Sequence, residues 1–546
     1  MNALRKLDAI AMEVFSNRLL SITEEMGNTL IRSAFSSNIK ERKDCSVALF
    51  DGSGQLIAQA SHIPVHLGAL SGAVEAAIKK YGTGMKPGDA YLSNDAYLAG
   101  GSHPPDLTVV GPVFVDGKLE FFIANVGHHT DVGGAVPGSN APHLRTVWEE
   151  GLRIPSTRIV DDGVMLKDII DLVAQNSREP DDRVHDLRAQ IATNEKGRRL
   201  LQELAGEIGM EKIQRTINDI FYYTEQRLRK RISELPSHVG EFEEFLDDDG
   251  LGGDPVPIRA SVRAIGDRLV VDFTGSGPEA RGSYNIPLNA LRASVYFAVK
   301  ALLDPGLLPN CGMFVPIEIV LPEKSIINPQ FPAAIGCRAT TAQRVAGTVI
   351  GALGKLLTNG RRMASCNDVM PAMVFSGPSG RRGGRFVYLE TLGGGAGGRE
   401  NGDGMDGVQV HITNTSNLPV EALEIEYPLM VEEYALVSRS GGRGEFRGGM
   451  GLARQIRALD PEVVCSVRCD GSMRGAEGLD GGEPGYPSRI VINHGQSTEE
   501  VIQTRATVQM SSGTTIRLET PGGGGFGNPA QRARNLVDAD VANEVC

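Results

Sequence analysis

The spacing of apolar positions predicts a long helix at the start of the chain, with strands and a second helix after it. Between residues 6 and 35, apolar side chains recur every three or four positions, as on one face of a helix. The elements expected here are that helix, a polar turn over 37–44, strands over 45–50 and 55–60 around Asp51-Gly52-Ser53-Gly54, and a helix from Leu70 within 62–80. Asp44 therefore stands at the start of a strand.

A second hairpin follows, and its geometry brings two polar clusters together. Apolar strands are predicted over 107–115 and 119–126, joined by Asp116-Gly117, a strong hairpin turn signal. Asp106 precedes the first strand and His128 follows the second. Both residues are therefore expected at the open end of the hairpin.

The rest of the chain is helical first and then rich in short strands. The elements expected are charged helices over 184–204 and 213–235, arranged as an αα-hairpin turning at Gly209, a β-hairpin over 260–265 and 269–273, helices over 289–303 and 341–357, and strands over 386–391, 422–425, 463–468, 489–493 and 515–519. This order predicts an α+β protein: a mixed multi-layer α/β N-terminal and central body with long helices, followed by a mainly β C-terminal region.

The composition shifts predict four segments. These are a metal-site α/β domain over 1–180, a helical segment over 181–256, an α/β central domain over 257–380 and a mainly β, glycine-rich domain over 381–546, with Gly377-Pro378-Ser379-Gly380 as a hinge. The 67 glycines gather in runs near 393–398, 441–451 and 522–527. They indicate either turns at sheet ends or close backbone approach to a ligand or partner.

Charge and hydropathy narrow the class of protein. The net charge of −12 argues against a nucleic-acid surface, which would be basic. No apolar run reaches the roughly 18 residues that span a bilayer, and the N-terminus lacks the apolar stretch of a signal peptide. We expect a cytoplasmic protein that binds neither nucleic acid nor membrane. The seven cysteines are expected to be reduced; Cys465 and Cys469 lack a second pair to complete a zinc site.

The two polar clusters at the hairpin's open end are typical of a metal site. Pro104-Pro105 hold His103 and Asp106 on a rigid loop. Because neighbouring strand residues point to opposite faces, only one of His128 and His129 is expected to join them, and parity does not choose. Imidazole and carboxylate donors suit Zn²⁺ or Mn²⁺. The alternative is a set of loop histidines satisfied by hydrogen bonds.

Other chemistries find little support. The sequence has no G-x-S-x-G nucleophile elbow and no G-K-[ST] ending to a glycine run, so no phosphate loop is indicated. A dinucleotide-binding turn at 393–399 lacks the acidic residue that should end a second strand.

Several motifs together resemble one family. They are Glu41-Arg42-Lys43-Asp44-Cys45-Ser46, Asn94-Asp95-Ala96-Tyr97, Gly101-Ser102-His103-Pro104-Pro105-Asp106, 127–134, 272–276, Glu426-Tyr427-Pro428, 440–442, 447–449 and 520–525. Nearly the whole chain is similar to the hydantoinase B/oxoprolinase family. That family includes the β subunits of ATP-dependent N-methylhydantoinases and caprolactamase, the C-terminal part of 5-oxoprolinase, and α subunits of acetone and acetophenone carboxylases.

The resemblance implies a ligand set. One divalent metal ion, Zn²⁺ first and Mn²⁺ as the alternative, would be held by the residues matching the family pattern, which are Asp44, His103, Asp106 and His128. The match favours His128 over His129. His129 and Asp131 are then expected to act beside the metal as catalytic or orienting residues.

The resemblance also implies a function shared with a partner. A hydantoinase A/oxoprolinase-type subunit would use ATP and Mg²⁺ to phosphorylate the carbonyl oxygen of a cyclic amide (a hydantoin, 5-oxoproline or a lactam). Water activated by this chain's metal would then attack the activated carbon. The expected assembly is an α2β2 hetero-oligomer. The alternative is the α subunit of an ATP-dependent ketone carboxylase.

Overall fold

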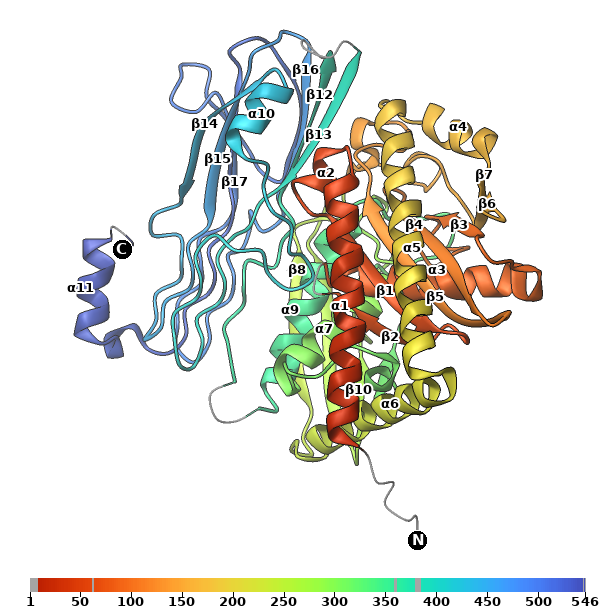
Figure 1. The fold of residues 1–546 in the computed structure, drawn as a ribbon. Coiled ribbons are helices and arrows are strands. Elements are labelled where there is room, and N and C mark those ends of the chain that lie inside the picture. The colour runs from red at the N-terminus through yellow and green to blue at the C-terminus, as the bar shows by residue number, and fades with distance from the viewer. Residues whose placement is uncertain (1–7, 61–62, 358–360, 379–383, 544, 546) are drawn as a thin grey trace.

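The computed structural model describes residues 8–60, 63–357, 361–378, 384–543 and 545, and in these it combines helices with four β-sheets (Figure 1). Helices take up 32% and strands 26% of the chain, which confirms the α+β class. The division into four domains stays a prediction.

The largest sheet carries the predicted metal-site hairpin. Its seven antiparallel strands lie in the order β2-β1-β5-β4-β3-β6-β7. Their bounds are β1 (Cys45–Asp51), β2 (Leu56–Gln59), β3 (Ala90–Ser93), β4 (Asp106–Val115), β5 (Lys118–His128), β6 (Thr157–Asp161) and β7 (Val164–Met165). The β4–β5 hairpin and the strands around 45–50 and 55–60 are thus confirmed.

Helices cover both faces of this sheet. Those that pack on it are α1 (Ala9–Ser33), α3 (His66–Tyr81) and α5 (Pro180–Ile208). In β1, Val47 and Leu49 belong to the core beneath α1, whereas Ala48 and Phe50 belong to the core beneath α3. A strand buried on both faces is expected to show an unbroken apolar run, as residues 47–50 do.

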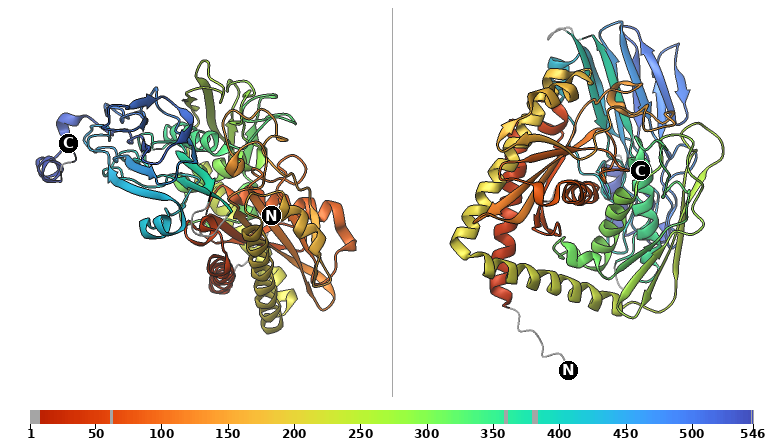
Figure 2. Two further views of the ribbon diagram at one scale, coloured as in Figure 1. Left: turned by 90° about the horizontal axis from the view of Figure 1, so that it is seen from above. Right: turned by 90° about the vertical axis from the view of Figure 1, so that its right-hand side faces the viewer.

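Three helical predictions need correction. A short helix, α2 (Ser37–Lys40), stands where a polar turn was expected. Helix α3 begins at His66 rather than Leu70, because its buried face already starts with His66 and Leu67. Helix α6 (Met210–Ser233) turns away from α5 at Gly209 instead of folding back beside it (Figure 2). No helix in the described part of the chain combines the length and apolar character that a membrane span requires.

The second sheet and its helices form the central layer. Its order is β11-β10-β9-β8, and β10 pairs parallel with β11. The elements are β8 (Gly240–Leu246), β9 (Val256–Ile265), β10 (Arg268–Asp272), β11 (Ile317–Val320), α7 (Leu288–Leu303), α9 (Arg338–Gly354) and the short helix α8 (Cys311–Phe314). The short helix α4 (Lys167–Gln175) packs instead on α5 and on β6 of the hairpin sheet. Helix α9 packs on α7 and on the strands β8 and β9, and α7 in turn packs on α3, so these helices link this layer to the hairpin sheet.

Two antiparallel sheets form the C-terminal part and share one apolar core. The strands are β12 (Ala372–Pro378), β13 (Arg385–Thr391), β14 (Leu429–Leu436), β15 (Leu452–Ala458), β16 (Val463–Arg468), β17 (Arg489–Ile492), β18 (Glu500–Ile502), β19 (Arg505–Met510) and β20 (Thr515–Glu519). The strand predicted over 422–425 is wrong, because α10 (Val420–Glu426) occupies it. Gly377 and Pro378 of the predicted hinge lie inside β12, and Ser379 and Gly380 lie outside the described residues.

Glycine runs pack against one another beside this sandwich, and α11 (Arg534–Ala542) follows them (Figure 1). A Cβ added to Gly448 would lie 1.9 Å from the Gly523 carbonyl oxygen. The Gly523 N–H donates to the Gly449 carbonyl at 2.9 Å. At these positions the close approach is to the chain's own backbone, and approach to a ligand or partner stays a prediction.

Candidate metal centre

The open end of the β4–β5 hairpin places three predicted residues together. Asp106 and His128 are directly paired as the first residue of β4 and the last of β5. His103 reaches them from the Pro104-Pro105 loop, with its Nε2 atom 3.2 Å from Asp106 Oδ1. The rings of His103 and His128 have centroids 5.0 Å apart. One donor atom from each residue lies within 4.8 Å of the others.

Two of these atoms face each other as unsatisfied acceptors. His103 Nδ1 lies 2.9 Å from the Gly336 carbonyl oxygen, which can only accept, so the ring proton sits on Nδ1. His103 Nε2 then presents a lone pair to a carboxylate oxygen. Both atoms are buried and have no hydrogen-bond partner among the described residues. A cation between them removes this repulsion, so the donor set fits a divalent metal ion.

Asp106 is held in its charged form. Burial opposes its ionisation, but the neighbouring side chains of His103, Arg338 and His66 outweigh that effect and keep the pKa of Asp106 well below the usual value. The guanidinium of Arg338 lies 2.8 Å from Asp106 Oδ2, and Ser102 Oγ donates to the same oxygen. These contacts occupy Oδ2 and leave Oδ1 for the site.

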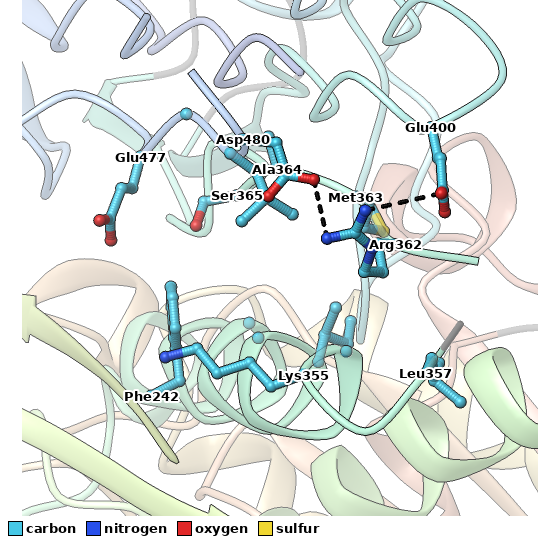
Figure 3. A pocket seen from close by; sticks show the side chains of 16 residues that line it. Phe242, Lys355, Leu357, Arg362, Met363, Ala364, Ser365, Glu400, Glu477 and Asp480 are labelled. Carbon is cyan, nitrogen blue, oxygen red and sulfur yellow. Dashed lines mark ion pairs between the residues drawn. The ribbon is translucent and has the colours of Figure 1, made fainter. Parts of the chain in front are cut away.

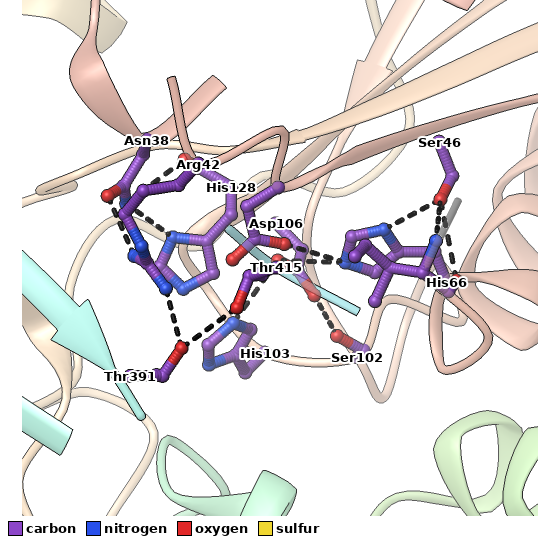
Figure 4. A network of polar contacts seen from close by, with 12 residues as sticks. Asn38, Arg42, Ser46, His66, Ser102, His103, Asp106, His128, Thr391 and Thr415 are labelled. Carbon is purple, nitrogen blue, oxygen red and sulfur yellow. Dashed lines mark hydrogen bonds and ion pairs between the residues drawn. The ribbon is translucent and has the colours of Figure 1, made fainter. Parts of the chain in front are cut away.

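The histidines are neutral at physiological pH, as metal ligation requires. Burial lowers the pKa of His128 to about 4. Burial and the charge of Arg338 also lower the pKa of His103. Asn38 Nδ2 lies 3.2 Å from His128 Nδ1, and the Arg42 guanidinium holds the Asn38 oxygen at 2.9 Å (Figure 4).

Asp44 lies beside this group, together with a histidine that the sequence reasoning missed. The Asp44 carbonyl accepts from the His128 N–H at 2.9 Å, because β1 pairs with β5. His66 Nε2 lies 3.6 Å from Asp44 Oδ1 and 3.8 Å from Asp106 Oδ1 (Figure 4). His66 sits in the first turn of α3, which the predicted helix start at Leu70 had left out. Had the start of this helix been predicted at His66, this histidine would have been a candidate ligand.

A small cavity lies at the centre of these residues. Its volume is about 40 Å³, which exceeds the roughly 10–15 Å³ that a water needs. Three of the four predicted ligands line it, namely Asp44, His103 and His128, and so do His66 and Arg338. Thr391 and Thr415 from the C-terminal part close its far side (Figure 4). The site is therefore a small cavity lined by residues from both halves of the chain.

His129 and Asp131 point elsewhere. His129 Nε2 lies 3.1 Å from Gln190 Oε1 on α5, and burial lowers the pKa of His129 to about 3. Asp131 accepts from the backbone N–H groups of its own loop and from Arg178. The groups that orient the site histidines are Gly336 and Asn38 instead. The predicted catalytic roles of His129 and Asp131 stay predictions.

Neither the buried cysteines nor a larger cavity elsewhere in the chain adds reactive groups to this site. Cys465 and Cys469 are buried, and burial raises the pKa of both thiols, so neither is poised as a nucleophile. A larger cavity of about 640 Å³ lies beyond the end of α9 (Figure 3). There Arg362 forms ion pairs with Asp480 and Glu400, and none of the predicted site residues lines the wall.

Comparisons with known proteins cover almost the whole chain. The sequence model described as hydantoinase B/oxoprolinase matches residues 8–529. The 5-oxoprolinase 1 of Arabidopsis thaliana is 34% identical over 95% of this chain and 42% of its own length. A protein of Pseudomonas sp. strain NS671, named as one subunit of a D-/L-hydantoinase, is 32% identical over 98% of this chain and 93% of its own. The chain thus spans about two fifths of the length of the 5-oxoprolinases it matches.

Two solved structures share the fold. The ATP-dependent caprolactamase of Pseudomonas jessenii superposes with a TM-score of 0.89 at 26% identity, over 99% of this chain and 95% of that one. The nucleotide-free acetone carboxylase superposes with a TM-score of 0.88 at 19% identity, over 99% and 78%. The second likeness concerns the fold alone.

Proposed function

The chain belongs to the hydantoinase B/oxoprolinase family, and on that premise we propose that it is the hydrolytic part of an ATP-dependent cyclic amide hydrolase. The substrate class is a hydantoin, 5-oxoproline or a lactam. The observation that carries the proposal is the pair of unsatisfied buried acceptors, His103 Nε2 and Asp106 Oδ1, at the hairpin's open end. Such a pair calls for a cation.

Asp44, His103, Asp106 and His128 would hold one divalent ion, with Zn²⁺ the first choice and Mn²⁺ the alternative. His66 lies within reach of the same space. When bound, such an ion supplies Lewis acidity and a water of lowered pKa.

The chain's own residues prepare the site for hydrolysis. Arg338 and Ser102 fix one oxygen of Asp106, and the other faces His103 Nε2. Gly336 fixes the proton of His103 on Nδ1. Because these groups are already in place, little reorganisation would remain for the reaction.

An unstrained amide is a poor electrophile, so hydrolysis needs prior activation. We place that step on a partner subunit of the hydantoinase A/oxoprolinase type, which would phosphorylate the carbonyl oxygen with ATP and Mg²⁺. Support comes from the missing phosphate loop, from the Pseudomonas relative that is named as one subunit of a hydantoinase, and from 5-oxoprolinases that are more than twice as long. We infer an α2β2 hetero-oligomer.

A ketone carboxylase α subunit is the second candidate. The acetone carboxylase structure, which covers 99% of this chain, favours it at the level of fold. The two candidates differ in the co-substrate: the carboxylase needs bicarbonate and the hydrolase does not.

Metal analysis tests the site first. Purified protein is expected to carry a divalent ion that His103→Ala loses, while His238→Ala, at an exposed histidine bonded to the Lys355 carbonyl, keeps it. The complex with the co-expressed ATP-binding partner is then assayed for ATP hydrolysis with hydantoins, 5-oxoproline, lactams, and ketones with bicarbonate. Turnover by this chain alone would refute the division of labour, and dependence on bicarbonate would select the carboxylase.

A further inference from the structure

A second group of metal-type side chains lies outside the hairpin site. Cys366 and Asp368 follow α9 in an irregular segment, and His411 lies in the loop between β13 and α10. One donor atom from each of the three lies within 4.8 Å of the others. We propose that Cys366, Asp368 and His411 form a second metal site, separate from the hairpin site, that binds a divalent ion of the zinc class.

The donor types favour zinc. Thiolate, imidazole and carboxylate are the three ligand types that protein zinc sites use. With Zn–S near 2.3 Å and Zn–N or Zn–O near 2.0–2.2 Å, the ligand atoms of a tetrahedral ion lie about 3.3–3.8 Å apart. The three donor atoms lie within 4.8 Å of one another, so an ion requires the His411–Asp368 contact to open to about 3.3 Å and the Cys366 sulfur to approach.

A buried, unpartnered oxygen points to a missing ligand. Asp368 is fully buried, its Oδ1 contacts His411 Nε2, and its Oδ2 has no hydrogen-bond partner among the described residues. Gly347 on α9 leaves room for this oxygen, because a Cβ there would lie 2.2 Å from Oδ2. The Cys366 sulfur accepts an N–H from Gly397 at 3.3 Å.

Buried carboxyl groups lie around the three side chains. Arg344 bridges Glu244 at 2.7 Å and Asp470 at 2.9 Å, and both carboxyl groups are buried. A cation held by Cys366, Asp368 and His411 would add positive charge to this acidic surrounding.

The alternative is a simple His411–Asp368 ion pair. That arrangement satisfies Oδ1 but leaves Oδ2 unpartnered and gives the Cys366 sulfur no role. A bound ion uses all three side chains. It would also reach the site, because His411 lines a cavity of about 580 Å³, and Gly347 and Ser365 line the cavity of Figure 3.

The position suggests a structural role for the ion. Met370, two residues after Asp368, and Thr413, two residues after His411, line the cavity of the hairpin site. An ion that joins the two segments would therefore hold one wall of that cavity. The site does not depend on the proposed function.

Cobalt substitution tests the proposal without an activity assay. The protein is stripped of metal under reducing conditions and reloaded with Co²⁺. Because the hairpin site contains no sulfur donor, a sulfur-to-cobalt charge-transfer band in the near ultraviolet reports only a cysteine-containing site. We expect this band and about two bound ions per chain in the wild type.

The variants separate the two sites. Cys366→Ser is expected to lose the band and about one ion, whereas His103→Ala loses about one ion and keeps the band. Cys311→Ser, at a half-exposed thiol near Gln55, is the matched control and should keep both ions and the band. A wild type without the band, or a band that persists in Cys366→Ser, overturns the proposal.

A measurement on the wild type covers the case in which Cys366→Ser does not fold. Zinc X-ray absorption of the fully loaded protein is expected to show a sulfur scatterer beside nitrogen and oxygen. A shell of nitrogen and oxygen alone overturns the second site but leaves the hairpin site standing. Failure of the hairpin site shows instead as a protein whose bound metal survives His103→Ala.

Discussion

At the scale of single residues, the site is defined by an unfavourable contact. A lone pair on His103 Nε2 faces Asp106 Oδ1 at 3.2 Å, in a buried place where neither atom reaches water. Such contacts cost free energy unless a cation lies between the atoms. The proposed cation would remove this cost.

Asp106→Asn tests this directly. The amide oxygen can still accept from Arg338 and Ser102, while the amide N–H can donate to His103 Nε2. We expect this variant to lose the hairpin-site ion, yet to unfold, when metal-stripped, at a free energy equal to or about 1 kcal/mol above that of stripped wild type. Metal analysis and urea titration measure both quantities.

Asp131→Asn is the matched control for that change. Asp131 is also a buried aspartate, but it bonds its own loop and Arg178 rather than the site histidines. It should keep its metal. If Asp106→Asn retained the ion, or if stripped Asp106→Asn were much less stable than stripped wild type, the facing acceptors would not be the feature that binds the cation.

Glu150 supports the site, and its titration makes the stability of the folded chain depend on pH. Its Oε1 accepts from the N–H groups of Ile335 and Gly336, and the Gly336 carbonyl orients His103. Burial raises the pKa of Glu150 from 4.5 to about 8. The folded chain thus keeps a proton that the unfolded chain releases, so this group's contribution to stability falls as pH rises from about 4.5 to about 8.

Glu150→Gln removes that titration while its amide oxygen keeps both hydrogen bonds. When the pH rises from about 5 to about 8, we expect the variant to lose less stability than wild type, with a difference on the order of 2 kcal/mol in free energy of unfolding. Urea unfolding at both pH values measures the difference. A difference that does not change with pH would mean that Glu150 ionises normally in the folded chain.

The sequence allowed part of this site to be predicted. The turn at Asp116-Gly117 was enough to place Asp106 and His128 at one end of a hairpin, because register follows from a tight turn. The approach of Asp44 depends on β1 pairing with β5, which is long-range. Cys366 and His411 come together from irregular segments that show no ligand spacing, so tertiary packing alone reveals them.

At the scale of elements, the apolar pattern predicted long helices and hairpins well and short segments poorly. A strand was predicted over 422–425, but α10 forms there behind Pro419, with Leu423 turned into the core. A few apolar residues fit both the period of a helix and that of a strand, and the glutamates of Val420–Glu426 favour a helix. Strand β14, whose burial alternates along its length, was not predicted, because three of its four exposed positions are apolar (Met430, Tyr434 and Leu436) and the alternation of burial is therefore not matched by an alternation of polarity.

The glycine runs pack closely through their backbones, and Gly448→Ala tests this packing. The new Cβ would meet the Gly523 carbonyl oxygen at 1.9 Å, and backbone on both sides cannot yield easily. We expect a loss of about 3 kcal/mol or more in free energy of unfolding. Gly354→Ala, at the end of α9 with no neighbour within 4 Å, should change it by less than about 1 kcal/mol. Equal thermal stability of the two variants would contradict close backbone packing.

At the scale of the whole molecule, the metal centre lies where the N-terminal body meets the C-terminal sheets. Arg42 makes this connection, and it is fully buried. Its guanidinium donates to Asn38 Oδ1 at 2.9 Å, to the Leu389 carbonyl at 3.0 Å and to Thr391 Oγ1 at 2.7 Å. One side chain thus ties β13 to the residue that orients His128.

Arg42→Met tests whether docking of the two halves and metal binding are coupled. The change leaves the Asn38, Leu389 and Thr391 oxygens without their buried donor, so we expect a loss of about 3 kcal/mol in free energy of unfolding. Because Asn38 is no longer fixed beside His128, metal affinity should fall roughly 10- to 100-fold. Urea titration and competition with a chelator measure the two effects.

Arg18→Met, at an exposed ion pair with Glu207, is the control and should change the free energy of unfolding by less than about 1 kcal/mol and leave metal affinity unchanged. An Arg42→Met protein that unfolds more easily but binds metal as tightly as wild type would show that the C-terminal half only covers the site, whereas a loss of both would show that it helps to build it.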